Sequence, residues 1–229
     1  MLEAKKKITK KQMKEDKLVT SYYKIQSFYF ENQAKVLIAV GVVALIIVAV
    51  ILLNKRSDSN NVAASAALAK VTPLIEAGSL NEAIEGDKTG NIDGLKKIVN
   101  EYGGSEAGEV ARIYLANAYF ILGKVDEALE QFEDYSGSND LLKGASKAGA
   151  AACYETKNEW KKAANLYLDA ANISKINPSN AEFLLKAGKC FIKLDEKSRA
   201  KEIFLSIKKD YPTSTVTFEL DKYLLQIEN

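Results

Sequence analysis

The pattern of hydrophobic and polar positions divides the chain into two unlike parts. An uncharged apolar run of eighteen residues extends from Val36 to Leu53, and the long segment after it places apolar residues at helical spacing among many charges. Eighteen residues at about 1.5 Å rise form a helix of roughly 27 Å, close to the hydrocarbon thickness of a bilayer. Because backbone groups inside lipid must be satisfied within the segment, the run predicts a single transmembrane helix at residues 36–54.

A buried core helix and a cleaved signal peptide are the alternatives for this run. The alanines around Ser65 resemble a small-residue cleavage site, but the apolar region of a signal peptide has only about 7–15 residues. Lys55 and Arg56 also separate the run from these alanines. The pattern therefore favours an uncleaved signal anchor.

Basic residues are concentrated before the apolar run. Residues 1–35 hold nine lysines and four acidic residues, a net charge of +5, whereas residues 54–229 hold 23 basic and 26 acidic residues, a net charge of −3. Since basic flanks remain in the cytoplasm, we predict a cytoplasmic N-terminus and an exported domain at residues 55–229. The negative balance of that domain is not typical of a nucleic-acid binder.

The basic arm at residues 1–35 ends in an amphipathic pattern. Leu18, Tyr22, Ile25 and Tyr29 recur at helical spacing. The pattern predicts an interfacial helix whose aromatic side chains lie at the headgroup level and whose lysines meet anionic lipid. The alternative is that this face docks on a membrane protein.

Three segments of the exported part, residues 115–135, 150–170 and 187–207, superpose without gaps. Each has an aromatic residue, an alanine nine residues later and a second aromatic residue four further on. These positions are Tyr119, Ala128 and Phe132 in the first, Tyr154, Ala163 and Tyr167 in the second, and Phe191, Ala200 and Phe204 in the third. The spacing predicts a helical hairpin in each segment, in which the alanine lets two helices approach and the aromatic residues fill the space beside it.

The turn of each hairpin begins with Gly123, Asn158 or Asp195, residues that tolerate the left-handed conformation that ends a helix. One hairpin cannot bury its apolar face alone, so we expect the units to stack into a solenoid. The pattern resembles the tetratricopeptide repeat over about residues 109–212, with Pro212 closing the third unit. The sequence therefore predicts an all-α fold, a transmembrane helix followed by a tetratricopeptide-like α-solenoid.

The segments that flank the repeats predict caps for the solenoid. Residues 63–77 and Ile92–Tyr102 have the apolar spacing of helices and would form a degenerate first hairpin. After the last repeat, Thr215–Ile227 has the same spacing and predicts a C-terminal capping helix.

Residues with catalytic or metal-binding chemistry are few in this chain. The sequence contains no histidine, which removes His-dependent triads and the commonest zinc ligand. The two cysteines, Cys153 and Cys190, occupy equivalent places in adjacent repeats, and such helices lie at least about 8–10 Å apart. A disulfide needs closer Cα atoms, so we predict two buried thiols. We expect no enzymatic activity, no cofactor and no bound metal.

Resemblance to tetratricopeptide modules implies a protein-binding groove lined by the first helix of each hairpin. The positions that face the groove in this family can be transferred to the present sequence. The residues found there are of mixed polarity, and they lack the lysines of the carboxylate clamp that chaperone-tail binders have. The predicted groove residues are Val110, Ile113, Asn117, Phe120, Ala145, Ala148, Ala152, Glu155, Glu182, Leu185, Lys189 and Lys193.

A second resemblance covers the whole arrangement of the chain. The stretch Ser27–Lys35, SFYFENQAK, leads directly into the apolar run and is followed by the repeats. This arrangement is similar to the YfgM family of ancillary Sec translocon subunits, which have a short cytoplasmic segment, one inner-membrane helix and a periplasmic repeat domain. The resemblance implies a bacterial inner-membrane location with residues 55–229 in the periplasm. It also implies two partners, the SecYEG translocon and a PpiD-like membrane-anchored PPIase chaperone.

Together these features predict a membrane-anchored periplasmic adaptor or co-chaperone of the Sec translocon. Its repeat groove would bind partner proteins or emerging, translocating polypeptides. A structural scaffold of another envelope complex, for secretion, motility or cell division, is the alternative that the same features leave open.

Overall fold

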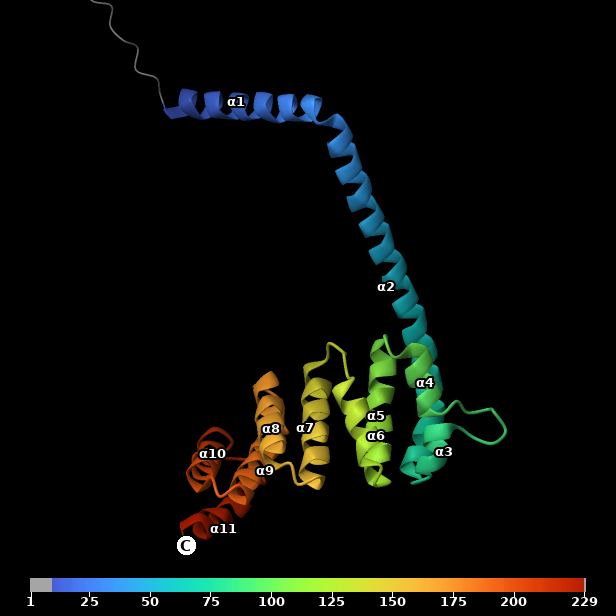
Figure 1. Ribbon diagram of the computed structural model, residues 1–229, viewed down its shortest axis with the longest axis vertical. Helices are drawn as coiled ribbons and strands as arrows, with labels where there is room; N and C mark the ends of the chain where they lie inside the picture. The colour runs from blue at the N-terminus through green and yellow to red at the C-terminus, as the bar shows by residue number, and fades with distance from the viewer. Residues whose placement is uncertain (1–9, 229) are drawn as a thin grey trace, which may run out of the picture. The chain divides into compact units, whose positions relative to one another are not determined.

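The computed structural model describes residues 10–228, apart from the side chains of residues 10–18, 49–54, Ile25, Ser27 and Arg56. The described part confirms the all-α prediction (Figure 1). The chain divides into two units, Met1–Arg56 and Ser57–Asn229. The helices are α1 (Lys10–Glu31), α2 (Gln33–Glu76), α3 (Leu80–Glu85), α4 (Leu95–Tyr102), α5 (Glu106–Ile121), α6 (Val125–Glu133), α7 (Asp140–Thr156), α8 (Trp160–Ile173), α9 (Asn180–Lys193), α10 (Lys197–Asp210) and α11 (Thr217–Glu228).

The first unit consists of α1 and the first part of α2. Over the described residues no single helix has both the length and the apolar character of a membrane span. The segments Val19–Glu31 and Gln33–Val48 reach the length and apolar character of a span only when they are taken together, and the chain bends by 91° between them. The side chains of residues 49–53, which complete the apolar run of the sequence, lie outside the described residues. The run is therefore confirmed as helical, and its insertion in a membrane stays a prediction.

Helix α2 corrects two predicted boundaries. The sequence predicts separate helices at residues 36–54 and 63–77, whereas one helix of 44 residues covers both. The polar stretch between them contains no glycine or proline, so nothing in it ends a helix. The end of the predicted second helix agrees with α2, which terminates at Glu76.

The predicted degenerate hairpin contains an additional short helix. Helix α3 was not predicted from the pattern, because its six residues are too few to show a period. It lies between Gly78 and Gly86, which both have positive φ. Helix α4 begins at Leu95 rather than at Ile92. The residues before it form an isolated antiparallel bridge between Gly86 and Asp93 instead.

The turns of the three repeat hairpins have the predicted conformation. Gly123, Asn158 and Asp195 have φ values of 74°, 60° and 57°. In each turn the next residue donates its backbone N–H to the carbonyl of the first recurring aromatic residue, over 2.9 Å. The pairs are Lys124 with Tyr119, Glu159 with Tyr154, and Glu196 with Phe191. These bonds satisfy carbonyls that the end of a helix leaves open, so one turn is built three times from different residues.

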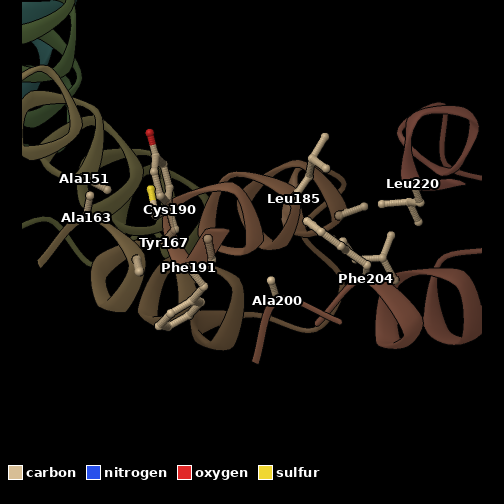
Figure 2. Close-up of a cluster of buried hydrophobic side chains, with 13 residues drawn as sticks. Ala151, Ala163, Tyr167, Leu185, Cys190, Phe191, Ala200, Phe204 and Leu220 are labelled. Carbon is tan, nitrogen blue, oxygen red and sulfur yellow. The ribbon is translucent and has the colours of Figure 1, made fainter. Parts of the chain in front are cut away.

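Alanine and aromatic positions of the repeats form the cores of the hairpins. The recurring alanines and the second aromatic residues are all buried, at Ala128, Ala163, Ala200, Phe132, Tyr167 and Phe204. Figure 2 shows the cluster that joins α7 to α11, with Tyr167, Phe191 and Phe204 as its largest side chains. A Cβ atom at Gly188 would lie 2.2 Å from the ring of Phe204. A small residue is therefore required at this crossing of α9 and α10.

Successive clusters rather than one central core stabilise the second unit. The first joins the end of α2 to α5, the next joins α5, α6 and α7, and the largest joins α7 to α11. Each element packs mainly against its neighbours in the chain, as expected for a solenoid. Helix α11 confirms the predicted capping helix to within two residues and buries Leu220 against the last hairpin.

Candidate protein-binding site

One face of the first helix of each repeat hairpin is accessible. In α5 this face carries Val110, Tyr114, Asn117 and Ile121, separated by four, three and four residues. That spacing keeps the four side chains within a narrow arc of a helix with 3.6 residues per turn. Tyr114 is 39% and Ile121 is 70% exposed, so α5 presents an apolar and aromatic strip.

The same spacing recurs on α7 and α9. The accessible side chains there are small on α7 and charged on α9. None of the twelve residues on these three faces is buried, and we call them together the repeat face. They are Val110, Tyr114, Asn117, Ile121, Ala145, Gly149, Ala152, Thr156, Glu182, Lys186, Lys189 and Lys193.

Seven of the residues predicted for the groove belong to the repeat face. The other five are Ile113, Phe120, Ala148, Glu155 and Leu185. Ile113 is 7% and Leu185 is 6% exposed, and both are members of the core clusters. A step of three residues from Val110 or Glu182 turns the side chain toward the neighbouring helix, whereas a step of four keeps it accessible.

Five residues of the repeat face were missed by the sequence reasoning. They are Tyr114, Ile121, Gly149, Thr156 and Lys186. These residues alternate at steps of four and three, but the packed edge of the same helix has a similar spacing, so only the neighbouring helices distinguish the two edges.

A depression between α2 and α5 extends the repeat face beyond the first repeat. Its volume is about 420 Å³, and its lining includes Leu68 and Thr72 of α2 together with Val110 and Tyr114 of α5. The Asn61 side-chain carbonyl accepts a hydrogen bond of 2.7 Å from the backbone N–H of Ala107, which fixes α2 to the start of α5. The end of α2 therefore acts as the first helix of a further unit.

A polar junction connects α7 to α9 through a side chain of α8. The Tyr167 hydroxyl donates a hydrogen bond of 2.9 Å to the Glu155 carboxylate. The Lys186 ammonium lies 5.7 Å from the centre of the Tyr167 ring and 3.6 Å from Glu182. Burial, together with the charge of Glu155, raises the pKa of Tyr167, so the hydroxyl remains a donor at neutral pH. The junction holds the charged side chains of this region in fixed positions.

The remaining lysines of α9 also lie over aromatic rings. Lys189 is 5.7 Å from the ring centre of Tyr223 in α11, and Lys193 is 5.9 Å from that of Trp160 in α8. Such contacts orient the ammonium groups without neutralising them. The repeat face therefore changes along the solenoid from apolar on α5, through small residues on α7, to basic side chains on α9.

The two cysteines have the environment that the sequence predicts. Both thiols are free and buried. Burial raises the pKa of Cys153 to about 11 and that of Cys190 to about 12. Because the thiolate is the reactive form, neither side chain is suited to nucleophilic or redox chemistry. Among the described residues no group of three or more Cys, Asp or Glu side chains is arranged to hold a metal ion.

The buried carboxylate of Glu109 is a structural link. It accepts hydrogen bonds from the backbone N–H of Ser136 over 2.9 Å and from its hydroxyl over 3.3 Å, and it pairs with Arg112 at 3.4 Å. These contacts fix the loop between α6 and α7 on α5. The same contacts satisfy the buried carboxylate of Glu109.

Comparison with known families identifies the third hairpin. The tetratricopeptide repeat family matches residues 182–214, which contain α9 from Glu182 onward, all of α10 and Pro212. A tetratricopeptide repeat is therefore present in this all-helical chain, and repeats of this kind are a non-catalytic fold for protein–protein interaction. No curated protein matches the chain, so the resemblance to the YfgM family receives no further support.

Proposed function

We propose that the chain is a membrane-anchored adaptor that binds an extended polypeptide segment along the repeat face. The accessible face on α5, α7 and α9 carries this proposal, because it is continuous in spacing and varied in polarity. The small side chains of Ala145 and Ala152 leave room for a bound main chain beside α7, whereas the Phe132 ring already fills the space next to Gly149. The seven predicted residues on this face, together with Tyr114 and Ile121, are the proposed contacts.

The polarity of the repeat face defines the kind of segment that fits. Tyr114 and Ile121 on α5 suit an apolar side chain, and the depression of about 420 Å³ beside Tyr114 gives it a place to enter. Lys189 and Lys193 on α9 suit an acidic side chain. The proposed ligand therefore has apolar and acidic residues at opposite ends.

The membrane part of the proposal rests on the apolar run and on the charge distribution. Residues 36–54 would cross the bacterial inner membrane, with the lysine-rich arm in the cytoplasm and residues 55–229 in the periplasm. Protease added to intact spheroplasts should digest the domain after about residue 60 and leave an N-terminal tag protected. A protected C-terminal domain would reverse the proposed topology.

The proposed partners follow from the resemblance to the YfgM family. They are the SecYEG translocon and a PpiD-like membrane-anchored PPIase, with translocating polypeptides as clients of a co-chaperone. Purification of the full chain from native membranes in mild detergent, followed by mass spectrometry, tests this assignment. Recovery of subunits of a secretion, motility or cell-division complex in place of translocon subunits would favour a scaffold.

Variants of the repeat face connect these partners to the site. The double substitution Tyr114→Ser and Ile121→Ser should remove the partners that bind through this face and leave the fold intact, because both side chains are exposed. Ile176→Ser is the matched control, since Ile176 is 88% exposed in the loop between α8 and α9. Equal recovery of partners with both variants would exclude the α5 strip as the binding site.

A further inference from the structure

Helix α1 has an exposed aromatic face. The apolar side chains Val19, Tyr22, Tyr23, Tyr29 and Phe30 are 44–63% exposed. At about 100° per residue they fall within an arc of roughly 120°. Two pairs of rings on this face meet edge to face, Tyr22 with Tyr23 at 5.8 Å and Tyr29 with Phe30 at 5.7 Å between ring centres. The arc is therefore mainly aromatic, and it also contains the polar side chain of Gln26 between the two pairs of rings.

The opposite side of α1 is mainly polar. It carries Thr20, Ser21, Lys24 and Glu31, and Phe28 is its one aromatic side chain among the described residues. Two residues of the predicted pattern, Leu18 and Ile25, have side chains outside the described part. Among the described side chains, most of the aromatic residues therefore lie on one side of α1.

Asn32 fixes the end of α1 where the chain bends by 91°. Its backbone N–H and its side-chain amide both donate to the carbonyl of Phe28, over 3.0 and 3.1 Å. Its own carbonyl accepts the backbone N–H of Val36 over 3.0 Å, so the next helix starts from the same residue. If α2 crosses a bilayer, a bend near a right angle lays α1 along the membrane surface.

The positive charge of residues 1–35 favours binding of α1 to a negatively charged membrane surface. Nine lysines and four acidic residues give residues 1–35 a net charge of +5. Aromatic rings with a polar edge are retained at the headgroup level, and lysines are attracted to an anionic surface. A protein partner within the membrane would instead favour small side chains at the contact, and the aromatic arc has none.

We propose that α1 is an in-plane helix that binds an anionic bilayer surface through Val19, Tyr22, Tyr23, Tyr29 and Phe30, with the lysines of the arm at the lipid phosphates. This site rests on the proposed membrane anchor in α2. It adds a second attachment with a different chemistry, because the anchor needs only hydrocarbon whereas α1 needs negative headgroups.

Spin labels on the full chain test the depth of each face. The chain is reconstituted in vesicles of phosphatidylcholine with phosphatidylglycerol, and single cysteines replace Tyr22, Ser21 or Val43 after Cys153 and Cys190 are changed to alanine. Collision rates with oxygen and with a water-soluble nickel chelate report depth. We expect the label at residue 22 at the headgroup level, at residue 21 in water and at residue 43 in the hydrocarbon. Omitting phosphatidylglycerol should move residue 22 toward water and leave residue 43 unchanged.

The outcomes separate this inference from the anchor on which it rests. The in-plane helix is overturned if the label at residue 22 is as exposed to water as the label at residue 21 while residue 43 is buried in lipid. That outcome leaves the anchor unaffected. A water-exposed label at residue 43 overturns the anchor itself. Shielding of residue 22 in native membranes but not in protein-free vesicles overturns lipid as the ligand and assigns the face to a membrane protein.

Discussion

The two units of the chain place their large apolar side chains in opposite environments. In the first unit, large apolar residues from Leu37 to Val48 are 50–72% exposed. In the second unit, apolar residues at helical spacing are covered by neighbouring helices, and Leu95, Ile98 and Phe191 are fully buried. Both segments are helical, so secondary structure alone does not explain the difference.

This difference shows that the distribution of apolar residues around a helix determines which environment the helix needs. A helix with one apolar stripe is covered by another helix, as in each hairpin of the repeats. A helix that is apolar on every side needs an apolar environment all round, which a single neighbour does not supply. The comparison is therefore open to tests that place the same change in both units.

A buried charge should have the largest effect, and only in the repeat unit. Ala163 is fully buried between the helices of the second hairpin, so Ala163→Glu would place a carboxylate there without a partner. An uncompensated buried charge costs on the order of 3–5 kcal/mol. Thermal unfolding of the full chain, followed by circular dichroism in mild detergent, should shift well below the wild type. An unchanged transition would mean that this alanine is not at the helix contact.

The same charge in the first unit should leave that unfolding transition in place. Val43 is 55% exposed on α2, so Val43→Glu removes no packing from the repeat core. In a membrane, however, a charge near the centre of a span costs about 2.5–3.5 kcal/mol. The variant should therefore be recovered less in the membrane fraction after cell lysis. Loss of thermal stability without loss of membrane association would reverse the assignment of the two units.

The destabilisation that the thiols cause at alkaline pH should be confined to the repeat unit, since both cysteines lie there. Burial raises the pKa of Cys153 and Cys190 above the ordinary value of 9.0, to about 11 and about 12. Well below pH 9 both thiols are protonated in the folded and the unfolded state, so they add no pH dependence there. Between pH 9 and about 12 the unfolded chain loses these protons first, and stability falls as pH rises.

The magnitude of this effect can be isolated with a thiol-free variant. At pH 10, one unit above the ordinary value, each thiol should lower the free energy of unfolding by about 1.4 kcal/mol. Lysines and tyrosines also titrate in this range, so the control is the double variant Cys153→Ala and Cys190→Ala. Its loss of stability between pH 8 and pH 10 should be smaller than that of the wild type. Equal slopes in denaturant titrations would show that the thiols are not the cause.

Much of this architecture could be predicted from the sequence, because three segments with the same spacing of residues identify equivalent positions in one another. The three turns, the buried alanines and the aromatic cores follow from aligning Gly123, Asn158 and Asp195. Helix α3 could not be predicted, since its six residues are too few to show a period. The length of α2 was also missed, because a polar surface stretch without a helix breaker has no apolar pattern to mark its continuation.

The candidate site was harder to predict than the fold. Seven of its twelve residues were predicted, and Ile113 and Leu185 were placed on the accessible side although they are buried. Steps of three and of four residues both keep a side chain on roughly the same face, so the periodicity of one helix does not separate its accessible edge from its packed edge. Only the positions of the neighbouring helices do so.

Alanine in place of glycine should distinguish the units by their packing. In α9 the added Cβ of Gly188→Ala would lie 2.2 Å from the Phe204 ring, and overpacking of this kind costs about 1–3 kcal/mol. In α2 a Cβ at Gly41 has no atom within 4 Å, so Gly41→Ala is the matched control. It should leave the unfolding transition unchanged. Equal transitions for the two variants would mean that Phe204 moves aside without cost.

The smallest expected effect concerns the turns, which differ in kind between the units. Asp195 has a φ of 57°, a conformation that costs a residue with a side chain about 1–2 kcal/mol. Asp195→Gly removes this strain but gives the unfolded chain more freedom, at a cost of roughly 0.5–1 kcal/mol. We expect a net stabilisation of a few tenths of a kcal/mol to about 1 kcal/mol in denaturant unfolding. Gly123→Ala should destabilise the equivalent turn, because Gly123 has a φ of 74°. If Asp195→Gly instead lowers stability, the aspartate contributes more to the turn than its strained backbone costs, and the three turns are not equivalent.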